Sequence, residues 1–347
     1  MCIKPMSNRQ SDLDNSRIYR IRLKSSMMSN NSDDEAEHFT KESHLQNILF
    51  ACYYLVVFIV AFPGNTMALW VFISKSENKT FTVFLRNLAI ADISYVLILP
   101  VRIIYHLNSK HWPFGETLCR LMGFLFYLNM YCSLYFMTCI SLDRLLAIVF
   151  PVKSINVRKL KNAHIISCIL WVALTVSLLP LLFSPQTVHM DNTTVCLQLY
   201  REQPSRRALG SLSVAFIIPL ITTVFSHLLI MHRLCKRDQV TKSIKDKAIK
   251  MIILVMIDFF VCFVPYHVNR FVYIHAFSSS VSSEMKNTLS LSNRITSALT
   301  SLNGALNPIL YFFLTQKFRK TLLNLLGRDE YRDSTTGYVP PSRGSKY

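Results

Sequence analysis

The chain has 347 residues, of which 51% are apolar and only 17% are charged, and its 38 Lys and Arg residues against 20 Asp and Glu give a formal net charge of +18. Soluble domains carry about 25% charged residues, so this composition argues against a soluble enzyme and a disordered chain, and indicates a membrane protein. Nine Cys residues are too few for a disulfide scaffold, and 8 Gly and 13 Pro residues exclude a collagen-like or low-complexity chain.

The N-terminal segment, residues 1–44, is polar and of mixed charge, which predicts a disordered tail. It contains no apolar run that resembles a signal peptide, so we expect the first apolar stretch to direct membrane insertion. Asn30 begins a glycosylation sequon in this tail, and Asn192 begins a second one farther along the chain. We expect both sequons on the outer side of the membrane.

Seven stretches are long enough to span a bilayer, which takes about 20 mostly apolar residues. They lie at residues 45–74, 86–102, 121–142, 162–190, 208–232, 250–270 and 287–316. Between their ends the only charged residues are Asp92, Asp258 and Arg294, whereas soluble amphipathic helices would show a charged face. The sequence therefore predicts an all-α membrane protein with a seven-transmembrane helix bundle over residues 45–315.

Basic residues predict the orientation of this bundle. The connections after the first, third and fifth stretches, together with residues 317–332, contain most of the Lys and Arg residues that lie between stretches. Because such segments stay in the cytoplasm, we expect a multi-pass protein of the plasma membrane with an extracellular N-terminus. A short amphipathic helix at 316–327 then lies on the inner membrane face, and residues 328–347 form a cytoplasmic tail. The positive charge suits anionic membrane lipids and requires no nucleic acid.

Polar side chains inside the apolar stretches are costly in a bilayer, so each one is a functional hypothesis. One interpretation is a water-filled pocket that holds Na⁺, and apart from this ion we expect no cofactor. The expected ligands of the ion are Asp92, Asn129, Ser133, Asn303 and Asn307. The alternative is that these groups only join neighbouring helices by hydrogen bonds.

Cys119 and the Asp143-Arg144 pair mark opposite ends of the third stretch. At 1.5 Å per residue, the helix between them is about 38 Å long, which is enough to cross the bilayer. Arg144 belongs to the inner end, so Cys119 lies on the oxidising outer side and can pair with Cys196 in the second outer loop. We expect this pair to be the only outer disulfide.

A series of short motifs occurs in order along the apolar stretches. It comprises Gly64-Asn65, Leu88-Ala89-Ile90-Ala91-Asp92, Trp112-Pro113-Phe114-Gly115, Asp143-Arg144-Leu145, Trp171, Pro219, Cys262-Phe263-Val264-Pro265 and Asn307-Pro308-Ile309-Leu310-Tyr311. Over about residues 46–326 the chain thereby resembles the rhodopsin-like (class A) G-protein-coupled receptors. His267 and Arg270 are similar to the His-x-x-Arg signature of the nucleotide and lipid-mediator receptors within that family.

This resemblance implies a receptor that couples to a heterotrimeric G protein, of the Gi family, with arrestin as a further partner. The residues implied in coupling and activation are Asp143, Arg144, Pro265, Asn307, Pro308 and Tyr311. Arg144 would pair with Asp143 in the inactive state and contact the G protein in the active state, while the sixth helix pivots at Pro265. The chain has no HExxH, GxSxG or Walker motif, and we expect no enzyme activity.

The outer ends of the stretches favour an anionic ligand. The third stretch lacks the carboxylate that an amine receptor needs, and the seventh lacks the Lys that an opsin needs. The candidate ligand contacts are Arg102, Tyr127, Tyr131, Tyr266, His267, Arg270 and Arg294. Arg binds phosphate or carboxylate through paired hydrogen bonds, which suits a uracil or sugar nucleotide or a cysteinyl leukotriene. The alternative is that these Arg side chains extend to lipid head groups.

Several residues depart from the family pattern. Leu145 stands where Tyr is usual, Asn307 where the subgroup commonly has Asp, and His227 where Tyr is usual. Asp258 occupies a normally apolar position, and Lys245 stands where many relatives have an acid that holds the Arg of the third-stretch motif. We expect Lys245, which would repel Arg144, and Asp258, which adds a buried polar group, to raise signalling in the absence of ligand.

Two alternative functions remain at this stage. One is an orphan receptor that signals without any ligand. The other is a membrane transporter for a small anion, which would also bury Asp92, Asp258 and Arg294. Transporters usually show paired halves or broken helices, and the sequence shows neither.

Overall fold

The computed structural model describes residues 33–74, 79–109, 111–190, 193–196, 206–236, 242–277 and 282–327. The chain divides into two compact units, residues 1–48 and 49–347, and the helix bundle belongs to the second unit. Both expected sequons, at Asn30 and Asn192, and the expected tail at 328–347 lie outside the described residues.

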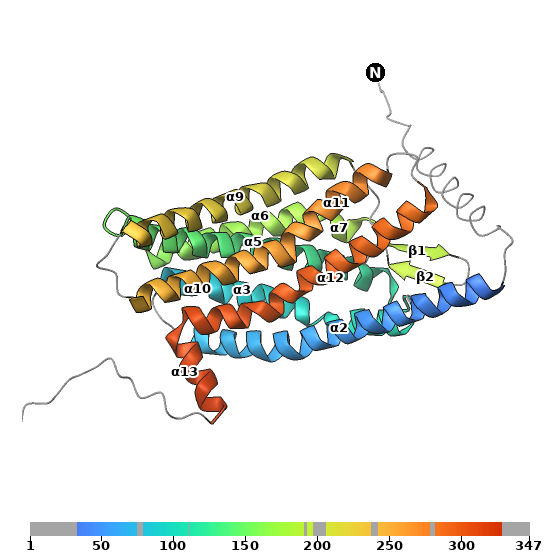
Figure 1. The fold of residues 1–347 in the computed structure, drawn as a ribbon, viewed down its shortest axis with the longest axis horizontal. Coiled ribbons are helices and arrows are strands. Elements are labelled where there is room, and N and C mark those ends of the chain that lie inside the picture. The colour runs from blue at the N-terminus through green and yellow to red at the C-terminus, as the bar shows by residue number, and fades with distance from the viewer. Residues whose placement is uncertain are drawn as a thin grey trace, which may run out of the picture. The chain divides into compact units, whose positions relative to one another are not determined.

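The described part is almost entirely helical (Figure 1). The helices are α2 (Asp33–Ser74), α3 (Thr80–Val96), α4 (Leu99–Leu107), α5 (Gly115–Val149), α6 (Leu160–Leu178), α7 (Pro180–Phe183), α9 (Arg206–Lys236), α10 (Lys242–Asp258), the π-helical turn η1 (Phe259–Phe263), α11 (Val264–Phe277), α12 (Ser283–Leu314) and α13 (Gln316–Leu325). Two antiparallel strands, β1 (Thr187–Met190) and β2 (Thr193–Cys196), form a hairpin with Thr187 opposite Cys196.

Six helical stretches in the described residues are long and apolar enough to cross a membrane. They lie at His44–Ser74, Thr80–Leu107, Gly115–Val149, Leu160–Phe183, Ser213–Lys236 and Ala248–His275. The seventh long helix, α12, packs against α3, α10 and α11. It is more polar because it buries Asn293, Arg294, Asn303 and Asn307 inside the bundle. The all-α prediction is confirmed.

Several expected boundaries differ from the structure, and two of the differences change which segments are helical. Helix α2 begins at Asp33, so the predicted tail at 1–44 includes the first residues of a helix. The stretch at 162–190 was predicted too long, because its helical part ends at Phe183 and its last residues form β1. Ser184 and Pro185 follow that helix, and a residue before Pro disfavours the helical conformation. Absence of charge therefore does not distinguish a spanning helix from an uncharged strand.

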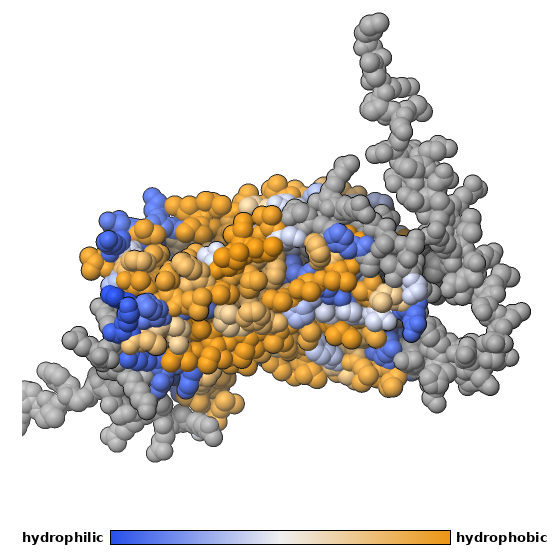
Figure 2. Space-filling view, turned by 45° about the horizontal axis from the view of Figure 1, so that its top comes forward, coloured by the Kyte–Doolittle hydropathy of each residue, from blue (hydrophilic) through white to orange (hydrophobic). Residues whose placement is uncertain are grey.

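The outward faces of the helices are apolar, as expected for contact with lipid. In Figure 2, hydrophobic side chains cover much of the visible bundle, and hydrophilic ones are gathered mainly toward its ends. On α6 the exposed side chains include Ile165, Ile169, Val172 and Val176. Trp171 on the same helix donates its indole N–H to Asn87 Oδ1 on α3 at 2.9 Å. This inward hydrogen bond fixes which side of α6 faces the bundle.

A glycine permits α2 and α12 to approach closely. A Cβ atom at Gly64 would lie 2.6 Å from Pro308 Cγ and 2.9 Å from Pro308 Cβ. We expect Gly64→Ala to lower the unfolding free energy of the purified protein by about 1–3 kcal/mol, because overpacking a close contact forces the backbone to move. Gly304→Ala is the matched control, since its Cβ would meet its nearest atom at 3.7 Å. Equal melting temperatures for the two variants would contradict this prediction.

Candidate functional site

A buried polar network lies in the middle of the bundle. Asn129 on α5 donates to Asp92 Oδ1 at 2.9 Å, and Asn307 on α12 donates to Asp92 Oδ2 at 2.6 Å. Tyr311 donates to Asn65 Oδ1 at 3.3 Å and also approaches Asp92 Oδ2 at 3.5 Å. These five residues come from four helices: Asn65 from α2, Asp92 from α3, Asn129 from α5, and Asn307 and Tyr311 from α12.

Ser133 and Asn303 are two further expected ligands of Na⁺. Asn303 donates to Ser133 Oγ at 2.8 Å, and its own Oδ1 is buried with no hydrogen-bond partner among the described residues. Asp92, Ser133 and Asn303 therefore supply a carboxylate, a hydroxyl and an orphaned amide oxygen, which are the ligands a hard cation takes. Asn129 and Asn307 present N–H groups to Asp92, so as placed they orient the carboxylate.

A second buried carboxyl lies on the sixth membrane-crossing helix. Asp258 is 3% exposed, and among the described residues neither of its oxygens accepts an N–H or O–H hydrogen bond. The Cys262 thiol lies beside it. The π-helical turn η1 begins at the next residue, and Pro265 follows on α11. Helix irregularities of this kind accompany bends. Asp258 is therefore the last residue before the segment about which we expect the sixth membrane-crossing helix to pivot.

Arg102 on α4 lies among aromatic rings, which we call the aromatic enclosure. Its guanidinium is 5.0 Å from the ring centre of Tyr54 and 5.3 Å from that of Phe126. It also donates to Tyr95 Oη at 2.6 Å, and Tyr95 shares a hydrogen bond of 2.7 Å with Ser301 on α12. Arg102 is only 2% exposed, so lipid head groups are not its partners.

The other expected cations continue this arrangement. The Arg294 guanidinium lies 4.7 Å from the Phe50 ring centre, and Phe50 stacks on His106. His106 also stacks on Tyr54, the ring beside Arg102. A continuous series of rings therefore connects Arg294 with Arg102.

Arg270 belongs to a neighbouring group on α5 and α11. It is 4% exposed, lies 5.6 Å from the Tyr273 ring centre, and is within electrostatic range of Tyr131. Tyr131 packs edge-on against His267, whose ring stacks on Phe216 with centres 3.9 Å apart. The three expected Arg residues are all buried, which favours a ligand site over lipid contact.

Phe126 connects the group around Arg102 with the group around Arg270. Its ring packs edge-on against Tyr127 and Tyr266, and Tyr266 donates to Tyr127 Oη at 3.1 Å. Sequence reasoning missed Phe126, Tyr54, Phe50 and Tyr95, because an aromatic residue in an apolar stretch gives no signal that separates a site from the core.

The β1–β2 hairpin is fastened to the N-terminal end of α5. Cys119 and Cys196 form a disulfide with Cα atoms 5.7 Å apart. Glu116, one turn earlier on α5, accepts hydrogen bonds from the backbone N–H groups of Gln186 at 2.6 Å and Thr187 at 2.9 Å, and from the Thr187 hydroxyl. The expected disulfide therefore acts together with a carboxylate that sequence reasoning missed.

We expect this disulfide to be the only one on the outer side of the surface-expressed protein. Among the described residues the other Cys side chains, at 52, 132, 139, 168, 235 and 262, are free thiols. Mass spectrometry of a non-reduced digest should recover a cross-linked peptide containing Cys119 and Cys196. Alkylation of both residues without prior reduction would contradict the expectation.

At the opposite end of α5, Asp143 is shared by two Arg residues. Arg144 Nη2 lies 2.9 Å from Asp143 Oδ2, as the resemblance implies. Arg158, which the sequence did not single out, lies 3.0 Å from Asp143 Oδ1 and 3.4 Å from Oδ2. The Arg144 guanidinium also lies over the Phe81 ring, 3.9 Å from its centre.

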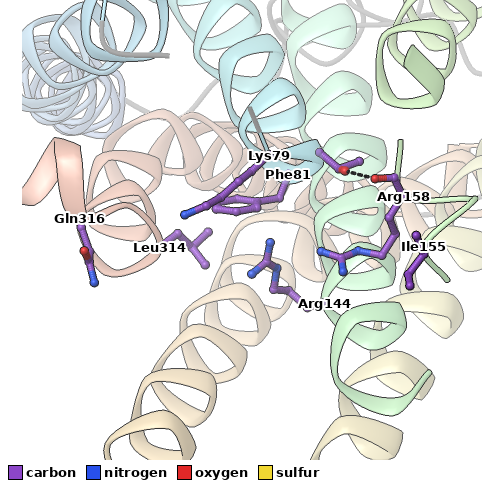
Figure 3. A pocket seen from close by; sticks show the side chains of 8 residues that line it. Lys79, Phe81, Arg144, Ile155, Arg158, Leu314 and Gln316 are labelled. Carbon is purple, nitrogen blue, oxygen red and sulfur yellow. Dashed lines mark hydrogen bonds between the residues drawn. The ribbon is translucent and has the colours of Figure 1, made fainter. Parts of the chain in front are cut away.

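These side chains border a cleft of about 630 Å³, which we call the inner cleft (Figure 3). It is lined by Lys79, Thr80, Phe81, Arg144, Ile155, Arg158, Leu314 and Gln316. The cleft lies at the helix ends for which the basic residues predict a cytoplasmic location.

Comparison with known proteins agrees with this architecture. Residues 64–311 match the model of the seven-transmembrane receptor (rhodopsin family). The chain is 55% identical over 302 residues to the uracil nucleotide/cysteinyl leukotriene receptor of Homo sapiens, covering 86% of this chain and 82% of that protein. It is 53% identical over 303 residues to the Mus musculus receptor of the same name, covering 87% and 89%. It is 32% identical over 337 residues to cysteinyl leukotriene receptor 1 of Mus musculus, covering 93% and 92%.

The matched range includes all five residues of the polar network, whereas Tyr54 and Phe50 of the aromatic enclosure precede it. The match removes the transporter alternative. Members of this family are receptors and not enzymes, and they reside in the plasma membrane as multi-pass proteins. The chain belongs to the rhodopsin family of seven-transmembrane receptors.

Proposed function

We propose that this receptor binds an anionic extracellular ligand of the nucleotide or cysteinyl leukotriene type and activates a G protein of the Gi family. The observation that carries the proposal is the burial of three Arg residues, Arg102, Arg270 and Arg294, among aromatic rings. Buried cations attract an anion strongly because little water screens them. The names of the related receptors support the same ligand classes.

The proposed mechanism is a shift between two conformations. A ligand changes their populations only by binding one of them better than the other. An anion drawn to Arg270 acts on α11, about one and a half turns beyond the irregular segment at Pro265. Movement of the sixth membrane-crossing helix about this segment would open the inner cleft, where Arg144 exchanges Asp143 for the G protein. Arrestin would use the same face.

The proposed orientation has the N-terminus outside, and it is supported by the basic residues around the inner cleft. Asn30 and Asn192 would then be available for glycosylation. Na⁺ bound by Asp92, Ser133 and Asn303 would stabilise the conformation in which all three are buried and Asn303 lies 2.8 Å from Ser133. This conformation would be the inactive one, so bound Na⁺ would lower signalling.

Guanine-nucleotide exchange tests this function directly. Purified receptor is mixed with Gi, Gq or Gs heterotrimers and a panel of uracil nucleotides, sugar nucleotides and cysteinyl leukotrienes. We expect faster exchange on Gi with at least one anionic ligand. Exchange that is fast and insensitive to the whole panel would favour the alternative of a receptor that signals without ligand. Absence of exchange on all three G proteins would contradict the proposal.

A further inference from the structure

The β1–β2 hairpin is attached to α5 through both members of one cross-strand pair. Thr187 on β1 lies opposite Cys196 on β2. Cys196 is joined to Cys119 by the disulfide, and Thr187 donates its backbone N–H at 2.9 Å and its hydroxyl to Glu116 Oε2. Glu116 and Cys119 are three residues apart on α5, so they lie on one face of that helix. Each strand of the hairpin therefore has its own attachment to α5.

The Glu116 carboxylate accepts four hydrogen bonds. Its Oε1 accepts from the backbone N–H of Gln186 and from Arg120 Nε, both at 2.6 Å, and its Oε2 accepts from the N–H and the hydroxyl of Thr187. Arg120 also donates to the Leu182 carbonyl on α7 at 3.3 Å. Hydrogen bonds to an ionised acceptor are about twice as strong as those between neutral groups. One side chain thus fixes the backbone at which β1 begins, without any contribution from the disulfide.

The hairpin is also connected to the aromatic enclosure. Trp112 donates its backbone N–H to the Thr194 carbonyl on β2 at 2.8 Å. The Trp112 ring packs edge-on against Tyr105, and Tyr105 packs edge-on against His106. His106 belongs to the series of rings that extends to Arg102. Displacement of the hairpin would therefore disturb the rings that surround Arg102.

We propose that Glu116 is a positioning residue that keeps the hairpin on α5 independently of the disulfide, and that it preserves the proposed ligand site when the disulfide is reduced. Each attachment fixes one member of the same strand pair, and the hydrogen bonds between β1 and β2 extend that constraint to the other strand. Releasing the hairpin then requires the loss of both attachments. The effect on the ligand site rests on the proposed function, whereas the attachment of the hairpin does not.

Thiol alkylation measures whether the hairpin stays in place. The full-length purified receptor is reduced with tris(2-carboxyethyl)phosphine and freed of the phosphine, and mass spectrometry then follows the reaction of each Cys with N-ethylmaleimide. Cys119 is 0% exposed and Cys196 is 1% exposed, so both react slowly after reduction as long as the hairpin covers them. Cys132, a buried free thiol farther along α5, reports any loosening of the whole bundle.

Glu116→Gln is the principal variant. It keeps the shape of the side chain but presents an N–H group to backbone donors. In the reduced receptor we expect it to speed alkylation of Cys119 and Cys196 at least tenfold, because it loses at least one charge-assisted hydrogen bond. The reaction of Cys132 should not change, since the packing of the bundle below the hairpin is untouched.

A second variant and a matched control complete the comparison. Thr187→Val removes only the hydroxyl donor, so it should speed alkylation of the same two Cys residues by about threefold or more. It keeps the proposal testable if Glu116→Gln fails to fold. Glu284→Gln is the matched control, because Glu284 is exposed in the first turn of α12. Its alkylation rates should lie within about twofold of those of the unchanged receptor.

Three alkylation results would overturn the proposal. The first is equal rates in reduced Glu116→Gln and reduced Glu284→Gln. The second is an equal acceleration at Cys132, which would show a general loss of stability. The third is rapid alkylation of Cys119 and Cys196 in the reduced unchanged receptor, because the disulfide alone would then hold the hairpin.

Fluorescent uridine diphosphate and fluorescent leukotriene D4 are the probes for the ligand site. Reduction should weaken binding of the effective probe at least tenfold more in Glu116→Gln than in the unchanged receptor. Equal weakening in the two would overturn the effect on the ligand site. If neither probe bound while the alkylation rates differed as expected, the attachment of the hairpin would stand and the proposed function would be contradicted.

Discussion

Replacing Arg270 by Ala is expected to lower agonist potency by about 30- to 150-fold. Arg270 is 4% exposed and lies in the same group as Tyr131 and His267. A hydrogen bond between charged groups is worth about 2–3 kcal/mol where water is excluded, which corresponds to this range of affinity. The measurement is a dose–response curve of nucleotide exchange at matched surface expression, with an agonist taken from the anionic panel.

Two further variants distinguish loss of the anchor from loss of packing. Arg270→Lys should recover only part of the potency, because an ammonium group cannot reproduce the paired hydrogen bonds of a guanidinium. His275→Ala, on the exposed face of the same helix, should leave potency unchanged. If Arg270→Ala retained full potency, the anchor would instead lie in the enclosure of Arg102 and Arg294.

Replacing Asp258 by Ile should lower the ligand-free signal and raise stability. A buried carboxyl group that is poorly satisfied by hydrogen bonds costs about 1–3 kcal/mol, and among the described residues Asp258 has only the weak thiol donor of Cys262. The carboxyl regains water if the sixth membrane-crossing helix opens, so it favours the open conformation. Removing it should therefore favour the closed one. Nucleotide exchange without ligand and the melting temperature of the same preparation measure the two effects.

Lys245→Glu should also lower the ligand-free signal. Lys245 is half-buried near the start of α10, at the position where the resemblance to the receptor family leads us to expect an acid that pairs with Arg144. An acid there would attract Arg144, whereas Lys245 repels it. Asp246→Asn is the matched control, because Asp246 is the exposed neighbour of Lys245. If neither Asp258→Ile nor Lys245→Glu changed the signal at matched expression, high basal activity would need another cause.

Much of this fold could be predicted from the sequence because a bilayer allows few solutions. Backbone groups in lipid must be satisfied within a helix, so long apolar stretches become spanning helices. The same cost makes each buried polar residue conspicuous, which is why Asp92, Asn129 and Asn307 could be grouped before their hydrogen bonds were known. The disulfide between Cys119 and Cys196 followed from helix length and the oxidising side of the membrane.

Other features were decided only by the tertiary structure. Arg158 competes with Arg144 for Asp143 because the segment between α5 and α6 folds back against α5. No local sequence pattern predicts that contact. Phe126 and Tyr54 enclose Arg102 although each resembles an ordinary core residue.

The inner cleft is the clearest such case. Its charge comes from Lys79 at the start of α3, Arg144 on α5 and Arg158 between α5 and α6. The sequence shows each of these basic residues separately. Whether they face the same space depends on how the helices pack, and packing is set by contacts between residues far apart in the chain.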